Sequence, residues 1–486
     1  MRAVSQGSER HIPLCVDLDG TLVRTDTLHE SVLELLRLSP KSLVELPRWL
    51  MKGKAYTKYR IAESVCVDVA TLPYCPEVIA LIEAARDQDR QVILATAAAP
   101  QIANAVAAHL SLFDVVICND EQTNLSGNKK ALRLSEHFGE GGFDYIGNAV
   151  CDIPVWQQAR NRIVVSPNHK LPNKLGIKGK SVKHLVRPQT IFRSLIKSCR
   201  PHQWLKNLLI FVPLFAGQKL TDPDAIMSAI FAFAAFCSAA SSIYVLNDLM
   251  DLSADRRHHR KRNRPFASGM LSIRFGVILA SALLLNAFLI GLTLEPLFLA
   301  ALGFYVFLTC AYSLRLKRQI VLDVMILAVL YTIRIIAGGA ATLIVPSFWL
   351  LAFSMFIFLS LALVKRCSEL NLLTDQSHSA AGRGYYASDM PVLMTLGASS
   401  GLISVLILAL YIDTPTVAMT YSEPLWLWLV PFAMLYWVTR LWMKTQRGEV
   451  HDDPVIFAAQ DKQSIFIVFV LAIVVMAAAQ GWRFWS

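Results

Sequence analysis

Apolar and polar positions follow different patterns in the two parts of the chain. Residues 1 to 190 mix charged residues with short apolar runs, whereas from about Leu205 onward apolar runs of membrane-spanning length alternate with short polar connectors. This pattern predicts an all-α transmembrane bundle that follows a soluble domain. We expect nine membrane-spanning helices, at 203–219, 225–247, 272–292, 296–314, 320–343, 347–365, 392–412, 423–443 and 463–483.

The soluble part alternates strand-like and helix-like segments. A strand-like run at 12–16 is followed by expected strands at 91–95, 114–118 and 143–147, with helices at 100–110 and 129–138 between them. This order is typical of an α/β domain built on a doubly wound parallel sheet. Residues 26 to about 75 are expected to form a small helical cap. The predicted organisation is a soluble domain at 1–165, a polar, proline-broken linker at 166–195 and a membrane domain at 196–486.

Composition and charge support membrane residence. The chain has 486 residues, of which 54% are hydrophobic, and its formal net charge is +11. Arginine and lysine gather in connectors 248–271, 315–319, 366–391 and 444–462 and are absent from the connectors between them. By the positive-inside rule, we expect a multi-pass protein of the plasma (inner) membrane whose soluble domain and active face are cytoplasmic. The same rule accounts for the basic excess, so no nucleic-acid role is expected.

An acidic cluster adjoins the second expected span. Asp248, Asp251 and Asp255 stand at positions i, i+3 and i+7, which share one face of a helix. Carboxylates are ligands that Mg²⁺ prefers, and an ion held by one or two of them keeps positions open for phosphate oxygens. We therefore expect one or more Mg²⁺ ions and a diphosphate here, with Asn247 orienting a metal ligand or a donor phosphate.

Basic residues near this cluster are candidates for binding the anionic ends of substrates. They are Lys206, Lys261, Arg262, Arg264, Lys365 and Arg366, and Arg334 within the fifth expected span joins them. For each of them the alternative is a structural role, as a span-end cation that reaches the lipid headgroups or as part of a buried ion pair. Asp255, likewise, can pair with a neighbouring arginine instead of a metal.

The soluble domain resembles the haloacid dehalogenase-like (HAD) phosphatases. The run Asp17-Leu18-Asp19-Gly20-Thr21 matches their first motif, in which the first aspartate attacks phosphorus and the second transfers the leaving-group proton. By this resemblance, Asp17 is the nucleophile and Asp19 the acid. Thr96 holds the phosphoryl group, and Lys130, or its neighbour Lys129, offsets the charge of the nucleophile. Asp17 and Asp152 are the implied ligands of one Mg²⁺ ion.

One position departs from the phosphatase pattern. The fourth motif usually opens with glycine and aspartate, but Asn148 follows Gly147 here, which removes one negative charge from the metal's surroundings. An asparagine carbonyl can still orient a metal-bound water. We favour an active phosphatase over an inactive one that is kept as a regulatory or stabilising domain.

The membrane part resembles the UbiA superfamily of intramembrane prenyltransferases. Residues 247–255 fit its first acidic motif, N-D-x-x-D-x-x-x-D. Within that superfamily the match is closer to the decaprenyl-phosphate phosphoribosyltransferases. The supporting segments are 200–207, 247–269, 312–317, 322–324, 333–338, 365–370 and 451–454.

The resemblance also predicts the substrates. Quinone-type relatives carry a second acidic cluster after the sixth span, where this chain has Lys365 and Arg366 with the lone acid Glu369. Cations in place of carboxylates favour more phosphate and less metal. The resemblance implies 5-phosphoribosyl 1-diphosphate (PRPP) as donor and a polyprenyl phosphate as acceptor, and the soluble domain would then remove the 5-phosphate of the product. Two alternatives stay open: transfer of an isoprenoid from its diphosphate to a small acceptor, and a non-catalytic membrane scaffold for a phosphatase. The oligomeric state is left open.

Overall fold

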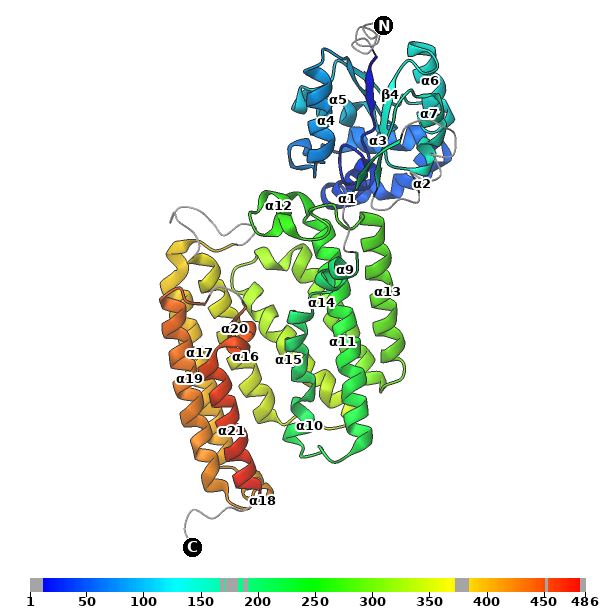
Figure 1. Ribbon diagram of the computed structural model, residues 1–486. Coiled ribbons are helices and arrows are strands. Elements are labelled where there is room, and N and C mark those ends of the chain that lie inside the picture. Colours follow the sequence, from blue (N-terminus) through cyan, green and yellow to red (C-terminus); the bar gives the residue numbers. More distant parts are fainter. Residues whose placement is uncertain are drawn as a thin grey trace. The chain divides into compact units, whose positions relative to one another are not determined.

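The computed structural model describes residues 12–166, 171, 182–186, 191–371, 384–450 and 453–480 (Figure 1). The chain divides into two compact units. The first unit contains Met1–Cys199 and Tyr244–Ala280, and the second contains Arg200–Ile243 and Ser281–Ser486. His451 and Asp452 of the predicted motif at 451–454 lie outside the described residues, as do 167–170, 172–181 and 187–190 of the predicted linker.

The first unit is built on a parallel sheet, as the sequence predicts. Its strand order is β3-β2-β1-β4-β5-β6, and every neighbouring pair is parallel. Chain order reverses between β1 and β4, which is where doubly wound sheets bind ligands at the carboxyl ends of their strands. The strands are β1 (Leu14–Val16), β2 (Val92–Ala95), β3 (Val115–Ile117), β4 (Asp144–Gly147), β5 (Arg162–Ser166) and β6 (Val182–Val186).

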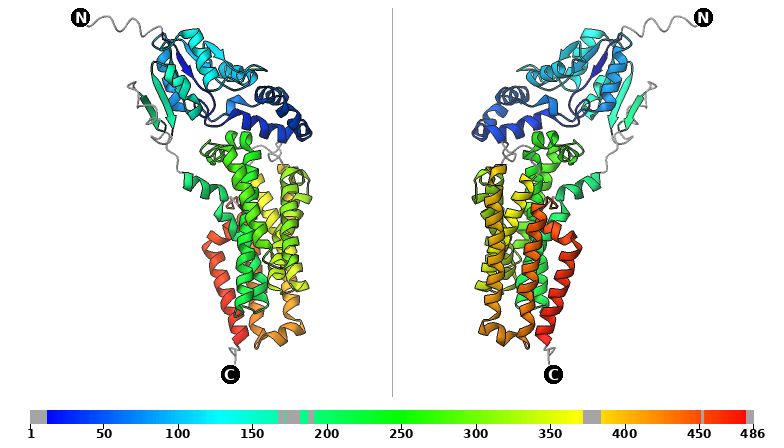
Figure 2. Two further views of the ribbon diagram at one scale, coloured as in Figure 1. Left: turned by 90° about the vertical axis from the view of Figure 1, so that its right-hand side faces the viewer. Right: turned by 90° about the vertical axis from the view of Figure 1, so that its left-hand side faces the viewer.

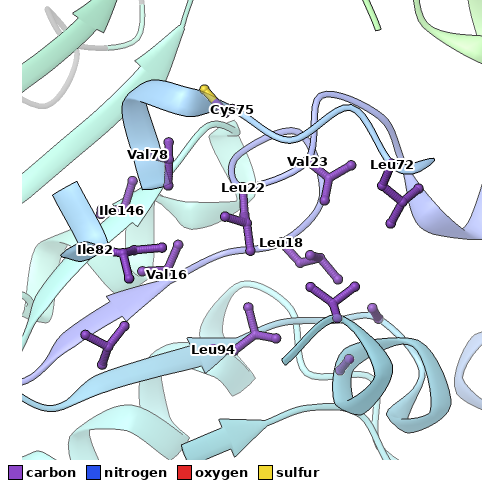
Figure 3. Close-up of a cluster of buried hydrophobic side chains, with 14 of the residues drawn as sticks. Val16, Leu18, Leu22, Val23, Leu72, Cys75, Val78, Ile82, Leu94 and Ile146 are labelled. Atoms are coloured by element: carbon purple, nitrogen blue, oxygen red, sulfur yellow. The ribbon is translucent and has the colours of Figure 1, made fainter. Parts of the chain in front are cut away.

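Helices cover both faces of this sheet. Alternate strand residues point to opposite faces, so Val16 packs with helix α4 in one core cluster, whereas Cys15 packs in another cluster with helices α6 and α7. Figure 3 shows the first cluster, where Val16 and Leu94 lie with Val78 and Ile82 of α4. The helices are α4 (Pro76–Arg86), α5 (Pro100–Leu110), α6 (Asn128–Phe138) and α7 (Ile153–Gln158).

The cap expected at 26 to about 75 is helical. Asp26 caps its first helix, because its side chain accepts hydrogen bonds from the backbone N–H groups of Leu28 and His29. The cap consists of α1 (Thr27–Leu38), η2 (Pro40–Glu45), α2 (Leu46–Met51), α3 (Lys54–Ser64) and η3 (Val69–Thr71).

The segment predicted as a linker contains regular structure. Strand β6 lies within 166–195 and extends the sheet beyond β5, and helix α9 (Ile191–Cys199) follows it. This strand has only five residues, and it was not predicted because the composition of the stretch is polar and contains proline. The sheet therefore extends beyond residue 165.

Long helices make up the second unit, and several of them lie side by side (Figure 2). Helix α15 is the most enclosed, since 72% of its most apolar window is buried. Helices within the second unit are α10 (Val212–Ala216), α14 (Pro296–Leu314), α15 (Leu322–Thr342), α16 (Phe348–Leu370), α17 (Met390–Ile412), α18 (Pro415–Thr420), α19 (Leu429–Gln446), α20 (Pro454–Gln460) and α21 (Lys462–Gln480). Helices α11 (Pro223–Met250) and α13 (Ile273–Gly291) cross the boundaries between the units, and α12 (Leu252–Arg257) lies in the first.

Eight helices of the described residues, not nine, are long and apolar enough to cross a membrane. The expected first span at 203–219 is wrong as a single helix. It forms the 3₁₀ segment η5 (Pro201–Phe211) followed by the five-residue helix α10. Pro213 lies at the start of α10, where a helix does not need the N–H group that proline lacks. The same lack prevents Pro213 from donating the hydrogen bond that would continue an α-helix from the preceding turn.

The 3₁₀ segment lies against α15 at a glycine. A Cβ atom on Gly338 would lie 2.0 Å from the carbonyl oxygen of Ile210. Only glycine allows so close an approach, and small residues commonly permit such backbone contacts between membrane helices. This contact fixes η5, and with it Lys206 and Asn207, on the buried helix α15.

Candidate functional site

The first candidate centre lies at the carboxyl ends of β1, β2 and β4. Asp17 follows β1, Thr96 follows β2 and Asn148 follows β4, so sheet topology alone brings these three positions to one edge. Thr96 is fully buried, and its hydroxyl oxygen accepts a hydrogen bond from the backbone N–H of Ala98. The sequence predicted this grouping.

Lys130 is the lysine of this centre. Its Nζ donates to Asp17 Oδ1 at 2.8 Å and lies 3.8 Å from Asp152 Oδ1, whereas Lys129 is exposed. Tyr145 supports the pair, because Lys130 donates to its hydroxyl at 3.0 Å and that hydroxyl donates to Asp152 Oδ1 at 3.0 Å. Asp152 Oδ2 also accepts the backbone N–H of Ala149 at 3.0 Å. The ammonium is thus fixed between two carboxylates.

The cap closes over Asp19. The Thr27 N–H at the start of α1 donates to Asp19 Oδ1 at 2.7 Å. Lys58 of α3 donates to the Ala97 carbonyl at 2.8 Å and, like Asp19 and Thr27, lines a pocket of about 10 Å³. That volume suits about one water molecule.

Charge in this centre is unbalanced. Three carboxylates, those of Asp17, Asp19 and Asp152, face the two lysines Lys130 and Lys58, which leaves one excess negative charge. Burial raises the pKa of Asp17 to about 7, although Lys130 opposes the rise, and burial together with the Asp26 carboxylate raises the pKa of Asp19 to about 6. Of these carboxylates, the buried pair Asp17 and Asp152 fits Mg²⁺, which prefers carboxylate oxygens.

Asn148 packs directly over the first motif. Its side-chain oxygen accepts a hydrogen bond from the Thr21 hydroxyl at 3.2 Å. Gly20 has a φ of +74°, and a Cβ atom there would lie 2.1 Å from Asn148 Nδ2. Glycine is required at this position both by its backbone conformation and by the amide above it.

A second centre, also in the first unit, joins Asp248 and Asp255. Both are 3% exposed, and both accept hydrogen bonds from Arg264 Nη1, at 3.1 Å to Asp248 Oδ1 and 2.6 Å to Asp255 Oδ2. One cationic nitrogen therefore lies between two carboxylates that are seven residues apart in sequence. The pairing of Asp255 with an arginine, which the sequence left open, is present.

Asp251 does not join this pair. The premise of one continuous helical face is wrong, because α11 ends at Met250, α12 begins at Leu252, and Asp251 lies exposed between them. Lys261 and Arg262 are also exposed, and Asn247 is half-buried in the last turn of α11. Whether these four residues contact a metal or a substrate stays a prediction.

Two carboxylates are enough for a substrate-bridged magnesium ion. Among the residues that the structure describes, no group of three or more histidine, cysteine, aspartate or glutamate side chains is arranged to hold a metal. Mg²⁺ in phosphate-handling sites commonly takes one or two carboxylates and completes its shell with water and phosphate oxygens. The Arg264 nitrogen marks a position where Asp248 and Asp255 already share a cation, so the pair fits Mg²⁺.

A third centre lies inside the second unit, around Asp453. Lys206 donates to Asp453 Oδ2, and Lys365 Nζ lies 3.6 Å from the same oxygen. Asp453 is 7% exposed and Lys206 is 8% exposed. Burial alone would raise the pKa of the Asp453 carboxyl, but Lys206 and Lys365 lower it to about 2. The carboxylate is therefore ionised at neutral pH and holds two lysines.

Arg334 adds a third cation to this region. Its Nε donates to Asn207 Oδ1 at 2.9 Å and its Nη2 to the Tyr305 hydroxyl at 3.2 Å. The Tyr331 ring lies close to both Arg334, at 5.8 Å, and Lys206, at 5.7 Å. Three cations, Lys206, Lys365 and Arg334, thus gather near one carboxylate. The sequence predicted these three residues, but Asp453 was only part of a family motif.

Arg366 points elsewhere. It is 1% exposed, and it pairs with Glu369 and, at 3.4 Å, with Asp323. Tyr385 donates to Asp323 Oδ1 at 2.5 Å. Consecutive residues on a helix point about 100° apart, so Lys365 and Arg366 reach different partners although the sequence grouped them together.

Sequence reasoning missed Lys58 and the role of Asp453. Lys58 lies in a cap helix where no motif marks it. Asp453 precedes Pro454, and its side chain accepts the Val455 N–H, which is a common start of a helix. An acid before proline at a helix start is an ordinary capping signal, so nothing in the sequence distinguished it.

Comparisons with known proteins confirm both resemblances. Residues 208–460 match the UbiA prenyltransferase family, and residues 14–155 match the haloacid dehalogenase-like hydrolases. The uncharacterized protein y4nM of Sinorhizobium fredii is 36% identical over 468 residues, which is 96% of this chain and 90% of that protein. Decaprenyl-phosphate phosphoribosyltransferase of Mycolicibacterium smegmatis is 36% identical over 219 residues, 44% of this chain and 69% of that protein. The structure of a UbiA homolog from Archaeoglobus fulgidus bound to DMAPP and Mg²⁺ superposes with a TM-score of 0.46 at 15% identity, over 59% of this chain and 99% of that chain.

Replacement of Lys130 tests the first centre. Lys130→Met leaves Asp17 and Asp152 buried without their ammonium, so we expect the free energy of unfolding of the soluble domain to fall by about 3–5 kcal/mol. Lys129→Met, at the exposed neighbour, should change it by less than about 0.5 kcal/mol. Thermal unfolding of the purified protein measures both, and equal effects would contradict the assignment of Lys130.

Replacement of Asp453 tests the third centre. Asp453→Asn leaves Lys206 and Lys365 without a carboxylate, so we expect a lower melting temperature in detergent, equivalent to about 3–5 kcal/mol. Added pyrophosphate should raise the melting temperature of this variant more than that of the parent, because an anion takes the place of the carboxylate. Asp413→Asn, an exposed acid of the same unit, is the control. A melting temperature insensitive to pyrophosphate in every variant would rule out an anion site here.

Proposed function

The chain belongs to the UbiA prenyltransferase family and carries a haloacid dehalogenase-like domain at its N-terminus, and on that premise we propose that it transfers a 5-phosphoribosyl group from PRPP to a polyprenyl phosphate. The products would be polyprenyl-phosphoryl-5-phosphoribose and pyrophosphate. The decaprenyl-phosphate phosphoribosyltransferase relative supports this choice of substrates. The eight long apolar helices and the family together make this an integral membrane protein.

The observation that carries the proposal is the group of three cations near Asp453. Lys206, Lys365 and Arg334 gather around that carboxylate within a mostly buried region of the second unit. Charges removed from water are costly unless they are paired. A ligand with several phosphate oxygens would balance them. PRPP carries a 5-phosphate monoester away from the reacting bond, and the phosphate of a polyprenyl phosphate is the attacking group itself.

Asp248 and Asp255 would hold the metal. Mg²⁺ bound there would neutralise negative charge that develops on a departing pyrophosphate. Arg264, which contacts both carboxylates, is placed to bind a phosphate oxygen once a metal takes its position between them.

The transfer step requires no strong base. The bond between ribose C1 and the pyrophosphate oxygen breaks, and pyrophosphate leaves with the electron pair. A new bond forms between C1 and an oxygen of the lipid phosphate, which is already anionic. The work of Lys206, Lys365 and Arg334 is to hold the anionic groups in a reactive orientation.

The soluble domain would act on the product. Asp17 would attack the phosphorus of the 5-phosphate, Asp19 would protonate the leaving ribose oxygen, and Lys130 would offset the negative charge at Asp17. Water would then release phosphate from Asp17. In this proposal the soluble domain and the active face are on the cytoplasmic side of the plasma (inner) membrane, and the positive charge of the connectors supports that orientation.

A labelled-donor assay tests the transferase. Ribose-labelled PRPP and polyprenyl phosphate, added to the purified protein with Mg²⁺, should give labelled lipid, and a chelator should abolish it. Asp248→Ala and Asp255→Ala should each lower the rate by about 100-fold or more, since the lost charge stabilisation is several kcal/mol. Asp251→Ala, at an exposed position, should have a smaller effect. If the protein transfers no label from PRPP but transfers the isoprenoid of a labelled prenyl diphosphate to a small acceptor, it is a prenyltransferase.

A second assay tests the phosphatase. With labelled PRPP the parent should yield lipid-linked ribose, whereas Asp17→Asn should stop at the 5-phosphate form because the nucleophile is lost. Glu63→Gln, in the same cap but exposed, should behave as the parent. Unchanged dephosphorylation by Asp17→Asn would refute the role of this domain.

A further inference from the structure

A buried ion pair connects the phosphatase cap to the acidic pair within the first unit. Arg256 Nη1 donates to Glu30 Oε2 at 3.1 Å and Nη2 donates to Glu30 Oε1 at 2.6 Å. The two side chains are 6% and 8% exposed. Arg256 Nε also donates to the Ala267 carbonyl at 2.9 Å. This two-point contact joins residues 226 positions apart in the chain.

Each partner belongs to an element that also holds a candidate centre. Glu30 lies one turn after Thr27 in α1, and the Thr27 N–H holds Asp19. Arg256 directly follows Asp255 in α12, and Asp255 is held by Arg264. A shift of α1 therefore acts on Asp19 at one end and, through Glu30 and Arg256, on Asp255 at the other.

We expect both centres to rearrange when they bind ligand. The pocket that α1 and α3 line beside Asp19 has room for about one water molecule, so a phosphate ester bound against Asp19 would displace α1 or α3. At the other end, a metal shared by Asp248 and Asp255 would replace the Arg264 nitrogen between them. Such a replacement changes what holds α12 in place. The buried ion pair of Glu30 and Arg256 links a movement of α1 to a movement of α12.

A second pair between the cap and α12 provides a comparison. Arg257 pairs with Asp68 of the cap, but the Arg257 side chain is 66% exposed and that of Asp68 is 31% exposed. Exposed ion pairs contribute little, whereas breaking a buried one leaves an uncompensated charge. If the cap and α12 communicate through charge, the buried pair is the one that can transmit it.

We propose that the Glu30–Arg256 pair couples the two centres, so that occupation of the phosphatase pocket changes the affinity of the acidic pair for Mg²⁺-diphosphate, and the reverse. The identity of the two centres rests on the proposed function. Coupling of this kind is reciprocal by thermodynamic necessity.

Calorimetric titration of the full-length protein with Mg²⁺-pyrophosphate, with and without saturating orthovanadate as a phosphate mimic, tests the coupling. We expect vanadate to change the apparent Kd of the parent by about five-fold or more, within the usual range of coupling between sites. Asp248→Asn identifies pyrophosphate that binds elsewhere. A Kd that vanadate leaves unchanged in the parent would overturn the proposal.

Matched variants assign the coupling to the pair. Glu30→Gln should abolish the effect of vanadate, and Asp68→Asn, which removes a half-buried acid from the same cap, should keep it. Glu30→Gln/Arg256→Gln removes both charges, so it avoids a buried unpaired charge and should fold even if Glu30→Gln does not. Coupling that persists in the double variant, or that Asp68→Asn also abolishes, would contradict the assignment.

Hydrogen exchange gives a readout independent of turnover. Mg²⁺-pyrophosphate should change exchange of the amides in Thr27–Leu38 in the parent and in Asp68→Asn but not in the double variant. No part of this test requires PRPP. A parent that transfers no label from PRPP but shows the coupling would refute the proposed substrate and leave the coupling standing, whereas transfer without coupling would do the opposite.

Discussion

A charged side chain withdrawn from water must find an opposite charge, because its hydration is worth several kcal/mol. That constraint organises all three candidate centres. Lys130 lies between Asp17 and Asp152, Arg264 lies between Asp248 and Asp255, and Lys206 and Lys365 share Asp453. The paired carboxylates of the first two centres suit a divalent cation, and the three cations around Asp453 in the third suit a phosphorylated substrate.

Buried charges outside the three candidate centres obey the same constraint. Arg366 is as deeply buried as any residue near these centres, yet Asp323 and Glu369 surround it with carboxylates. Asp144 is similarly matched by Arg90 and Arg160 near the beginning of β4. Both sets hold elements of the fold together.

Sequence patterns predicted the fold well where apolar residues form long runs or where strand-like and helix-like segments alternate regularly. The α/β alternation predicted β1 to β4, α5 and α6 within two residues, and apolar runs predicted eight helices, whereas β5, β6, α4 and α7 were not predicted. The errors lie where local backbone geometry decides. Nothing in the composition of 203–219 specified a 3₁₀ helix, and the spacing of Asp248, Asp251 and Asp255 did not show that the helix breaks at the middle acid. Asp453 and Lys58 needed contacts between segments far apart in the chain, which one sequence does not display.

The space that Asn148 occupies fits an asparagine or an aspartate side chain equally well. The Thr21 hydroxyl that donates to its amide oxygen would donate equally well to a carboxylate, and the space over Gly20 fits either planar group. Asparagine and aspartate differ there by a single atom and one unit of charge. The single substitution Asn148→Asp would therefore restore the family's usual acid within the same space and would add one negative charge beside Asp17 and Asp152.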